Sequence, residues 1–319
     1  FGEHLVEIAE KRNDIIVIDG DLSADCKLRK FEYRFPERFI ENGIAEQDMV
    51  STAGGLARMG MLPIVSSFAS FLTSRANEQI YNNACEHTKI IYACHFSGLI
   101  PAGPGKSHQS VRDISLLSAI PNITIIQPAN KMEMIKALDW AVYKANENVA
   151  LRMVIGPSPR NIQFNEDFDL KVGRGNIIRN GSDSVLFAYG PVMLHEALLA
   201  SEILENEGYS LRVVNMPWLN RIDNNLFNDI IKDVKQIFTL DDHSVYGGLG
   251  DLIINALNQS DFCNDKAVTK FGLDEYPACG TPNEVLGYHK LDGKSLAERI
   301  LNKSINFELL TKYSVEAPQ

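Results

Sequence analysis

The stretch Gly43-Ile44-Ala45-Glu46-Gln47-Asp48-Met49-Val50 places one carboxylate, Glu46, where an apolar strand gives way to a helix. The apolar positions of residues 39–44 indicate a short buried strand. Residues 45–57, which end in Ala-Gly-Gly-Leu-Ala, indicate a helix thin enough to pack closely against a neighbour. A carboxylate near a helix N-terminus is common, because the helix dipole favours it. On these residues alone, a dipole partner is the simpler interpretation of Glu46.

The rest of the first half alternates strand-like and helix-like segments. Continuous apolar runs of strand length suit a parallel sheet that is covered on both faces. These runs are residues 15–18, 63–66, 89–93 and 123–126. Between them, apolar residues recur at helical spacing over residues 49–59, 74–85 and 132–144. The alternation predicts βαβ units with right-handed crossovers.

Turn-forming residues at 156–160 and acidic residues at 165–169 interrupt this pattern. We place a linker at residues 158–172, between a first domain of residues 1–157 and a second of residues 173–319, since 319 residues suffice for two domains. Strand-like segments resume at 184–190, 211–214 and 236–240, with a helical segment at 193–207. The predicted fold class is α/β, with two successive domains whose mostly parallel sheets are flanked by helices.

The composition argues against several classes of function. The net charge of −10 is spread along the chain without a basic run, so we expect no nucleic-acid partner. No apolar stretch is long enough to span a bilayer and no signal peptide is visible, so we expect no membrane partner. The five cysteines are scattered and lack a CxxC spacing, which favours a reducing, cytoplasmic location over a disulfide framework or a zinc site.

Two phenylalanines, Phe68 and Phe71, follow the strand-like run 63–66. In parallel-sheet folds the ends of strands border the ligand crevice, and flat rings there can stack on a heteroaromatic ring. Burial of both rings in the core explains them equally well, because aromatic side chains are usually buried. The pair is therefore a candidate binding element with a structural alternative.

Two histidines, His95 and His108, flank a loop rich in glycine and proline after the strand-like run 89–93. Histidine can donate to anionic or hydroxyl groups and can move protons near neutral pH. A structural role is the usual alternative for either histidine alone, but two on one irregular loop favour a site, since loops carry function. No carboxylate or cysteine lies at a spacing that would make them metal ligands.

These segments together resemble one family, the transketolases. The resemblance rests on residues 35–47 (Phe-Pro-Glu-Arg-Phe-Ile-Glu-Asn-Gly-Ile-Ala-Glu-Gln), on the Phe68–Phe71 segment and on Gly105-Lys106-Ser107-His108-Gln109. It extends to Asp242-His243-Ser244-Val245-Tyr246-Gly247-Gly248-Leu249-Gly250 and so covers nearly the whole chain. It implies a pyrimidine-binding domain at residues 1–157 and the family's C-terminal domain at residues 173–319.

The family uses thiamine diphosphate, and the resemblance implies the roles of three residues. Glu46 corresponds to the glutamate that hydrogen-bonds the cofactor pyrimidine. Apolar surroundings would keep its carboxyl protonated and favour the imino tautomer, which removes the thiazolium proton. Phe71 corresponds to the ring that stacks on the pyrimidine, and Phe68 lines the same pocket.

The resemblance also implies a set of substrate contacts. His108 corresponds to a histidine that contacts substrate oxygens and assists proton transfer, and His95 to a second such histidine. We assign Asp21 and Lys106 to substrate binding as well. Lys106 and Arg160 are candidate cations for a substrate that is a modified, nucleotide-linked or non-phosphorylated sugar.

That unusual substrate is suggested by departures from the family pattern. Pro104 stands where the family commonly has an aspartate, and Asp25 replaces a serine near the first strand. After Arg152, where many members have another arginine, this chain has Met153. A negative charge at Asp25 would repel a phosphate.

The family's diphosphate-binding domain has no counterpart in this sequence. Its Gly-Asp-Gly and downstream Asn are only imitated by Asp19-Gly20-Asp21 and Asn42, which lie in the wrong order and within the pyrimidine-binding resemblance. The resemblance therefore implies a separate N-terminal subunit, in an α2β2 heterotetramer. That subunit would hold the diphosphate and its Mg²⁺ or Ca²⁺, and we assign no metal ligand to this chain.

The expected activity is transfer of a two-carbon ketol unit from a ketose donor to an aldose acceptor. Two related enzymes are alternatives: the β subunit of a 2-oxo-acid dehydrogenase and a deoxyxylulose-phosphate-synthase-like enzyme. An alternative of another class is a non-catalytic paralogous subunit, which should have lost the cofactor residues. Glu46, Phe71 and His108 are all present, which favours an enzyme.

Overall fold

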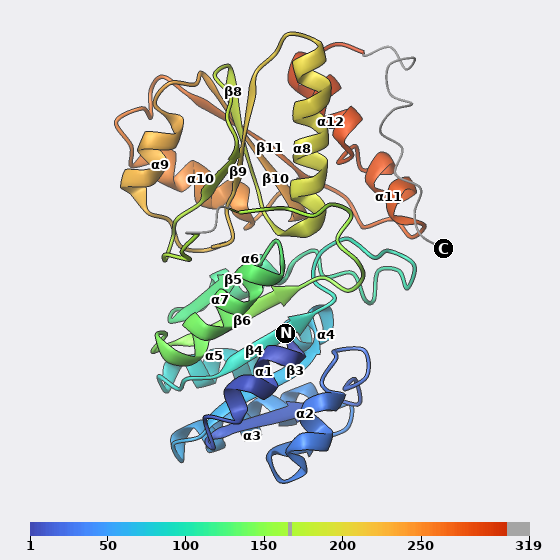
Figure 1. The fold of residues 1–319 in the computed structure, drawn as a ribbon, viewed down its shortest axis with the longest axis vertical. Helices are drawn as coiled ribbons and strands as arrows, with labels where there is room; N and C mark the ends of the chain where they lie inside the picture. Colours follow the sequence, from blue (N-terminus) through green and yellow to red (C-terminus); the bar gives the residue numbers. More distant parts are fainter. Residues whose placement is uncertain (165–167, 305–319) are drawn as a thin grey trace.

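The computed structural model describes residues 1–164 and 168–304, and its lower half in Figure 1 is built on one parallel sheet. The strands of this sheet are β1 (Ile15–Asp19), β2 (Phe39–Glu41), β3 (Leu62–Phe68), β4 (Ile91–His95), β5 (Ile123–Ile126) and β6 (Asn148–Met153). Their order is β2-β1-β3-β4-β6-β5, and every neighbouring pair is parallel. The parallel βαβ sheet expected from the apolar runs is confirmed.

Helices cover both faces of this sheet. They are α1 (Gly2–Ala9), α2 (Arg29–Arg34), the 3₁₀ turn η1 (Pro36–Arg38), α3 (Glu46–Arg58), α4 (Ala69–Arg75), α5 (Asn77–Cys85), α6 (Asp113–Ser118) and α7 (Lys131–Tyr143). Because all strands of this sheet run the same way, the loops after their carboxyl ends gather at one edge. That edge carries the candidate site and faces the second half of the molecule (Figure 1).

The second sheet is mixed. Its strands are β7 (Asn176–Arg179), β8 (Ser184–Ala188), β9 (Leu211–Asn215), β10 (Gln236–Ser244) and β11 (Ala267–Leu273), in the order β11-β10-β8-β9-β7. Only β7 is antiparallel to its neighbour among the described strands. Its helices are α8 (Gly190–Asn206), α9 (Asn224–Ile231), α10 (Leu249–Asn258), α11 (Pro282–Tyr288) and α12 (Gly293–Leu301). In Figure 1, α8 and α12 lie on one face and α9 and α10 on the other.

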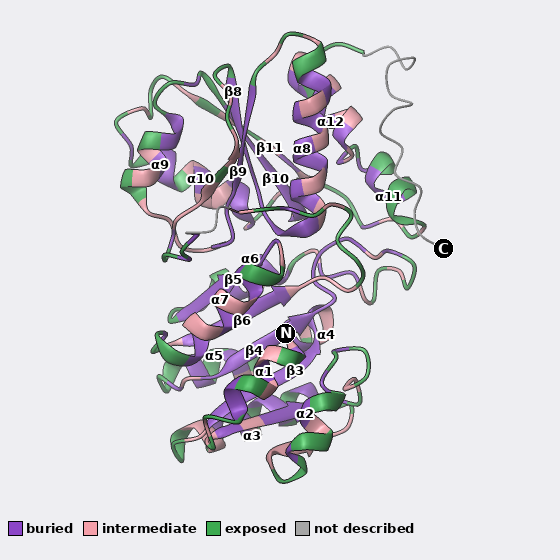
Figure 2. Ribbon diagram, in the orientation of Figure 1, coloured by how far each residue is buried: buried purple, intermediate pink, exposed green. Residues whose placement is uncertain are grey.

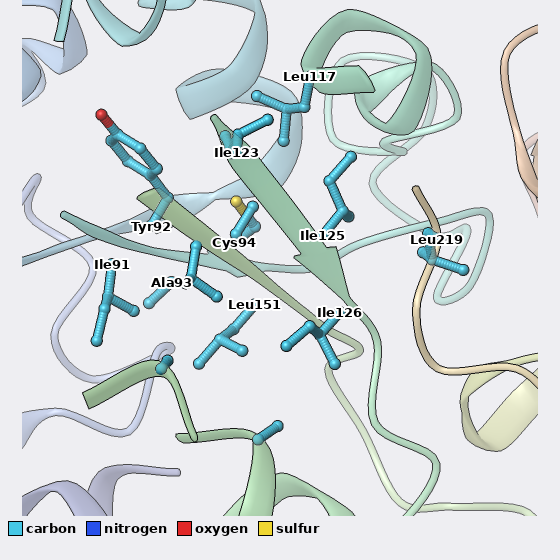
Figure 3. Close-up of a cluster of buried hydrophobic side chains, with 14 of the residues drawn as sticks. Ile91, Tyr92, Ala93, Cys94, Leu117, Ile123, Ile125, Ile126, Leu151 and Leu219 are labelled. Atoms are coloured by element: carbon cyan, nitrogen blue, oxygen red, sulfur yellow. The ribbon is translucent and has the colours of Figure 1, made fainter. Parts of the chain in front are cut away.

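The inner strands of both sheets are almost wholly buried, as the purple ribbons in Figure 2 show, whereas the edge strands β2, β7 and β11 are largely half-buried or exposed. Figure 3 shows part of the core, where side chains of β4, β5 and β6 meet. Leu219, from the second half of the chain, lies beside this cluster, and its N–H donates to the carbonyl of Ile125 at 2.9 Å. Trp140 and Trp218 add an edge-to-face contact between the halves, with ring centres 4.9 Å apart. The segment after β9 therefore docks the second half of the chain on the first through apolar and backbone contacts.

Two local expectations are wrong. The strand expected over residues 39–44 ends at Glu41, and Ile44 is 72% exposed. The cause is a turn at Gly43, whose φ of +67° favours glycine and directs the chain away from the sheet. The helix expected over residues 74–85 is two helices, because Ala76 (φ −107°, ψ 20°) leaves the helical conformation between α4 and α5.

Some expectations fall outside the described residues. Residues 165–167 of the expected linker and residues 305–319 of the expected second domain lie outside the described residues. Within the described ranges, no helix is long and apolar enough to cross a membrane.

Candidate active site

Glu46 is the first residue of α3, and its side chain is buried. The residue is 4% exposed, and no side-chain cap precedes it at Ala45. Burying a carboxylate costs free energy unless it finds a partner. That partner is Arg75 at the end of α4, whose Nη1 donates to Glu46 Oε1 at 2.8 Å. The expected apolar surroundings of Glu46 thus include one guanidinium.

Arg75 also lies over an aromatic ring. Its Cζ is 4.1 Å from the ring centre of Phe71, which lies four residues earlier on α4. A planar guanidinium favours such a position because the face of the ring is negative. Arg75 therefore joins the Glu46 carboxylate to the ring of Phe71.

His108 completes this cluster from the loop between β4 and α6. Its ring centre lies 5.0 Å from Phe71, 5.8 Å from Phe68 and 6.1 Å from Phe96. Phe68 is the last residue of β3 and lies 5.6 Å from Phe71. Phe68 and Phe96 are buried, whereas Phe71 and His108 are half-buried. The structure thus brings together four residues singled out from the sequence: Glu46, Phe68, Phe71 and His108.

His95, at the end of β4, lies opposite Phe68 in the sheet, but its ring packs against Phe1, with ring centres 5.4 Å apart. It borders a cavity of about 370 Å³ whose lining includes Lys27, Lys131 and Arg152. Burial lowers the pKa of His95 to about 3, so the ring is neutral near pH 7, and its Nε2 has no hydrogen-bond partner among the residues that the structure describes. Within the described ranges, no ring contact or hydrogen bond joins it to His108. The two expected substrate histidines therefore face different surroundings.

Three further residues expected to contact the substrate, Asp21, Lys106 and Arg160, have their own partners outside the cluster of Glu46, Phe71 and His108. Asp21 is exposed after β1, with a φ of +62°, and its N–H donates to Glu41 Oε1 at 3.0 Å. Lys106 is exposed, and its Nζ lies 5.3 Å from the ring centre of Tyr276. Both terminal nitrogens of Arg160 donate to the carboxylate of Glu202, and its role as a replacement cation stays a prediction.

Arg152, at the carboxyl end of β6, has no exposed surface and was not expected to be paired. Nε and Nη2 donate to the two carboxylate oxygens of Asp113, at 2.8 and 3.0 Å. Nη1 also lies 3.3 Å from Oδ1 of Asp242 on β10. Burial alone disfavours the charge, but these two carboxylates raise the pKa of Arg152 above its usual value. Its charge is therefore satisfied inside the protein.

This ion cluster gives the segment 242–250 a structural role. A Cβ at Gly98 would lie 1.9 Å from Asp242 Oδ2, and one at Gly247 would lie 2.4 Å from Cβ of Ser115. Both glycines have positive φ, so side chains there would be strained as well as crowded. Asp242 and the glycines thus allow the second half of the chain to approach the loop after β4 and the helix α6.

The Glu46–Phe71–His108 cluster has the chemistry to bind a flat nitrogen heterocycle. A carboxyl can hydrogen-bond a ring nitrogen, a half-buried phenyl ring can stack on it, and an imidazole can transfer protons nearby. These residues fit the pyrimidine of thiamine diphosphate. In the part of the chain that is described, no group of three or more His, Cys, Asp or Glu side chains is placed to hold a metal ion.

Comparisons with known protein families cover most of this chain. The model of the transketolase pyrimidine-binding domain matches residues 1–154, and that of the transketolase C-terminal domain matches residues 173–296. The "Putative transketolase C-terminal section" of Methanocaldococcus jannaschii is 34% identical over 308 residues, covering 95% of this chain and 94% of that protein. The 1-deoxy-D-xylulose-5-phosphate synthase of Halothermothrix orenii is 31% identical over 94% of this chain, which spans about half (47%) of that enzyme.

Solved transketolase structures are also similar to this chain. A split-gene transketolase described as an inactive beta4 tetramer superposes with a TM-score of 0.84 at 30% identity, covering 94% of this chain and 95% of that one. A transketolase from Campylobacter jejuni superposes with a TM-score of 0.78 at 20% identity, covering 95% of this chain and 46% of that one. The second similarity is one of fold.

Proposed function

This chain belongs to the transketolase family, and we propose that it is one subunit of a two-chain, thiamine-diphosphate-dependent enzyme. Two findings support the two-chain arrangement. A relative named as a C-terminal section matches this chain over 94% of its own length, and a split-gene transketolase has the same fold over 95% of its length. The deoxyxylulose-phosphate synthases, by contrast, are about twice as long as the region they share with this chain.

The observation that carries the proposal is the cluster in which Arg75 joins Glu46 to Phe71 and His108 packs against Phe71. Glu46 would hydrogen-bond the cofactor pyrimidine and hold a proton at its ring nitrogen. Phe71 would orient the pyrimidine ring by stacking, and Phe68 would exclude water behind it. The bound cofactor would supply the electron sink for carbon–carbon bond cleavage.

His108 lies next to the proposed pyrimidine position and would move protons to and from substrate oxygens. Its ring centre is 5.0 Å from that of Phe71. We propose His95, Asp21 and Lys106 as further substrate contacts, each of which has different neighbours from those of His108. The cavity beside His95 is lined by Lys27 and Lys131 as well as by Arg152, whose charge is satisfied by carboxylates, and we propose that it receives polar groups of a sugar or sugar derivative.

The proposed reaction is transfer of a two-carbon ketol unit from a ketose donor to an aldose acceptor. A second candidate is a deoxyxylulose-phosphate-synthase-like reaction, which the 31% identity to the Halothermothrix orenii enzyme favours. The same cofactor site would serve both reactions. Donor choice distinguishes them, since the first predicts turnover with ketoses and the second predicts formation of 1-deoxy-D-xylulose 5-phosphate.

The proposed partner is a separate diphosphate-binding subunit in an α2β2 heterotetramer. We propose that the partner holds the diphosphate together with Mg²⁺ or Ca²⁺, and that the complex acts in the cytoplasm. For this chain we propose a pyrimidine-binding domain at residues 1–157, a linker at 158–172 and a C-terminal domain at 173–319. Each domain contains one of the two sheets.

The test is reconstitution of the complex. This chain is co-purified with a candidate diphosphate-binding subunit, supplied with thiamine diphosphate and Mg²⁺, and assayed with several ketose donors. Glu46→Gln should abolish turnover, whereas Asp48→Asn, an exposed carboxylate in the same first turn of α3, should leave it unchanged. Cofactor binding with equal turnover in wild type and Glu46→Gln would contradict the proposal.

A further inference from the structure

The loop that carries His108 is closed at its base by its own backbone. The N–H of Gly98 donates to the carbonyl of Ser110 at 3.1 Å, and the N–H of Ser110 donates to that of Gly98 at 3.0 Å. Residues 99–109 extend from this base towards the second domain. Proton transfer requires His108 to be held in position, and a loop of this length needs further anchors to do so.

Those anchors come from residues 276–279, between β11 and α11 of the second domain. Gln109, directly after His108, is only 3% exposed. Its Nε2 donates to the carbonyl of Ala278 at 2.9 Å and to that of Leu99 at 3.1 Å. One buried amide thus ties the residue next to His108 both to the start of its own loop and to the other domain.

Two contacts continue this attachment along the loop. Sγ of Cys279 donates to the carbonyl of Gly103 at 3.1 Å. Lys106 Nζ lies 5.3 Å from the ring centre of Tyr276, which is within the range of a cation–π contact. The attachment therefore reaches the loop at its middle as well as beside His108.

The segment 276–279 is itself held from behind. The N–H of Ala278 donates to Nε2 of His289, a buried residue at the C-terminal end of α11, at 3.0 Å. The N-terminal end of α11 is fixed by a capping box between Thr281 and Glu284. The anchor for Gln109 is thus part of an ordered element.

We propose that the second domain positions His108 for proton transfer through residues 276–279, with Gln109 as the principal positioning residue. This rests on the proposed function of His108. In this assignment Gln109 acts through its Nε2 donor, which is used by the carbonyls of Leu99 and Ala278, while its buried Oε1 has no hydrogen-bond partner among the described residues. The second domain is then required for the geometry of the site as well as for the stability of the subunit.

A general loosening of the domain contact is the alternative explanation for any effect at Gln109. The chain offers a matched control at Asn220, which also bridges the two halves. Its Nδ2 donates to the carbonyl of Ile123 at 2.9 Å, and its Oδ1 accepts from the N–H of Ile125 at 3.0 Å. Asn220→Ala removes two bonds between the domains without touching the His108 loop.

The first measurement uses the full chain without partner or cofactor. The ring C–H signals of His108 are recorded by NMR in histidine-labelled protein and assigned with His108→Asn. Gln109→Met keeps the length and packing of the side chain but removes its donor. We expect the His108 signals to shift or broaden in Gln109→Met and to match wild type in Asn220→Ala.

The second measurement uses the reconstituted complex. Gln109→Met should lower kcat by about 10- to 100-fold, as expected for a small displacement of a catalytic group, with KM for the donor changed less than about 2-fold. Cys279→Ala should show a smaller loss in the same direction. Cys279→Ser, which keeps a donor for the carbonyl of Gly103, should restore the wild-type value.

Unchanged His108 signals and kcat in Gln109→Met would overturn the proposal, and so would equal effects in Asn220→Ala. If circular dichroism shows that Gln109→Met does not fold, the proposal is tested instead with Cys279→Ala and Cys279→Ser. The His108 signals and kcat of these two variants are then compared with those of wild type. A wild-type complex that binds cofactor but transfers no ketol unit would contradict the proposed function instead. The NMR comparison would still decide whether the second domain positions His108.

Discussion

Arg75 Nη1 lies 2.8 Å from Glu46 Oε1, so the buried carboxylate at the start of α3 is held by an arginine from α4. The same guanidinium lies 4.1 Å from the ring centre of Phe71. The two residues proposed to hold the cofactor pyrimidine are therefore connected by one side chain. This arrangement has consequences for stability that need no cofactor.

Arg75→Ala should lower the free energy of unfolding by about 1–2 kcal/mol, because it leaves a buried carboxylate without its charged partner. The same change in a Glu46→Gln background should cost less, since no charge is then left unpaired. Urea unfolding of the four proteins of this double-mutant cycle measures the coupling. Arg112→Ala, which loses a contact with Ser74 on the exposed surface, is the control. Additive losses in the cycle would show that the ion pair is not coupled.

Phe71→Leu should weaken the binding of thiamine diphosphate to the reconstituted complex by about 3- to 10-fold. Leucine keeps apolar volume but loses the flat ring, and aromatic stacking contributes about 0.5–1.5 kcal/mol beyond buried area. Titration calorimetry gives the dissociation constant. Tyr81→Leu removes a half-exposed ring from α5 and should have no effect. Equal affinity in Phe71→Leu and wild type would remove Phe71 from the cofactor site.

Arg152→Met should cost about 3–5 kcal/mol of stability, because it leaves the carboxylates of Asp113 and Asp242 buried without their cation. Asp242→Asn should cost less, since Asp113 keeps both of its bonds to Arg152. Thermal or urea unfolding compares the three proteins. A loss below about 1 kcal/mol in Arg152→Met would show that the cluster adds little to domain docking.

Glu196 on α8 gives a prediction of pH dependence. Burial raises the pKa of its carboxyl to about 7, above the value of about 4.3 in an unfolded chain. The folded chain therefore keeps a proton that the unfolded chain has already lost. This stabilisation is full below about pH 4 and is lost as the pH rises towards 7.

Glu196→Gln keeps an oxygen that can accept the N–H of Gly293, which lies 2.7 Å from Glu196 Oε2, and removes the titration. The variant should gain stability over wild type as the pH rises from 5 to 8, by about 1–3 kcal/mol at pH 8. Urea unfolding at several pH values measures the difference. A difference that does not change with pH would contradict the raised pKa.

Four strands of the first sheet, β1, β3, β4 and β5, could be predicted from the sequence because they are largely buried and therefore appear as continuous apolar runs. The sequence does not predict β6, whose buried residues include the polar Asn148 and Arg152. The meeting of Phe68, Phe71 and His108 could be predicted for a related reason: each follows a strand of a parallel sheet, and such segments gather at one edge. The turn at Gly43 was missed because the apolar residue that follows it, Ile44, points to solvent.

The partners of the site residues could not be predicted. The helical spacing over residues 74–85 predicts one helix that includes Arg75, whereas the break at Ala76 leaves Arg75 at the end of α4, four residues after Phe71. That i, i+4 spacing was the available signal. Arg152 and Asp242 are 90 residues apart and meet only through domain docking, which local spacing does not encode.

The central claim, that Glu46 activates a pyrimidine whose diphosphate is held by another chain, is tested most directly by proton exchange on the cofactor. In the reconstituted complex, the rate at which the C2 proton of thiamine diphosphate exchanges for deuterium is measured by NMR for wild type, Glu46→Gln and Asp48→Asn. We predict that Glu46→Gln slows the exchange by about 100-fold or more with cofactor still bound, and that Asp48→Asn leaves it unchanged. Equal exchange rates in wild type and Glu46→Gln, with cofactor bound to both, would contradict the account.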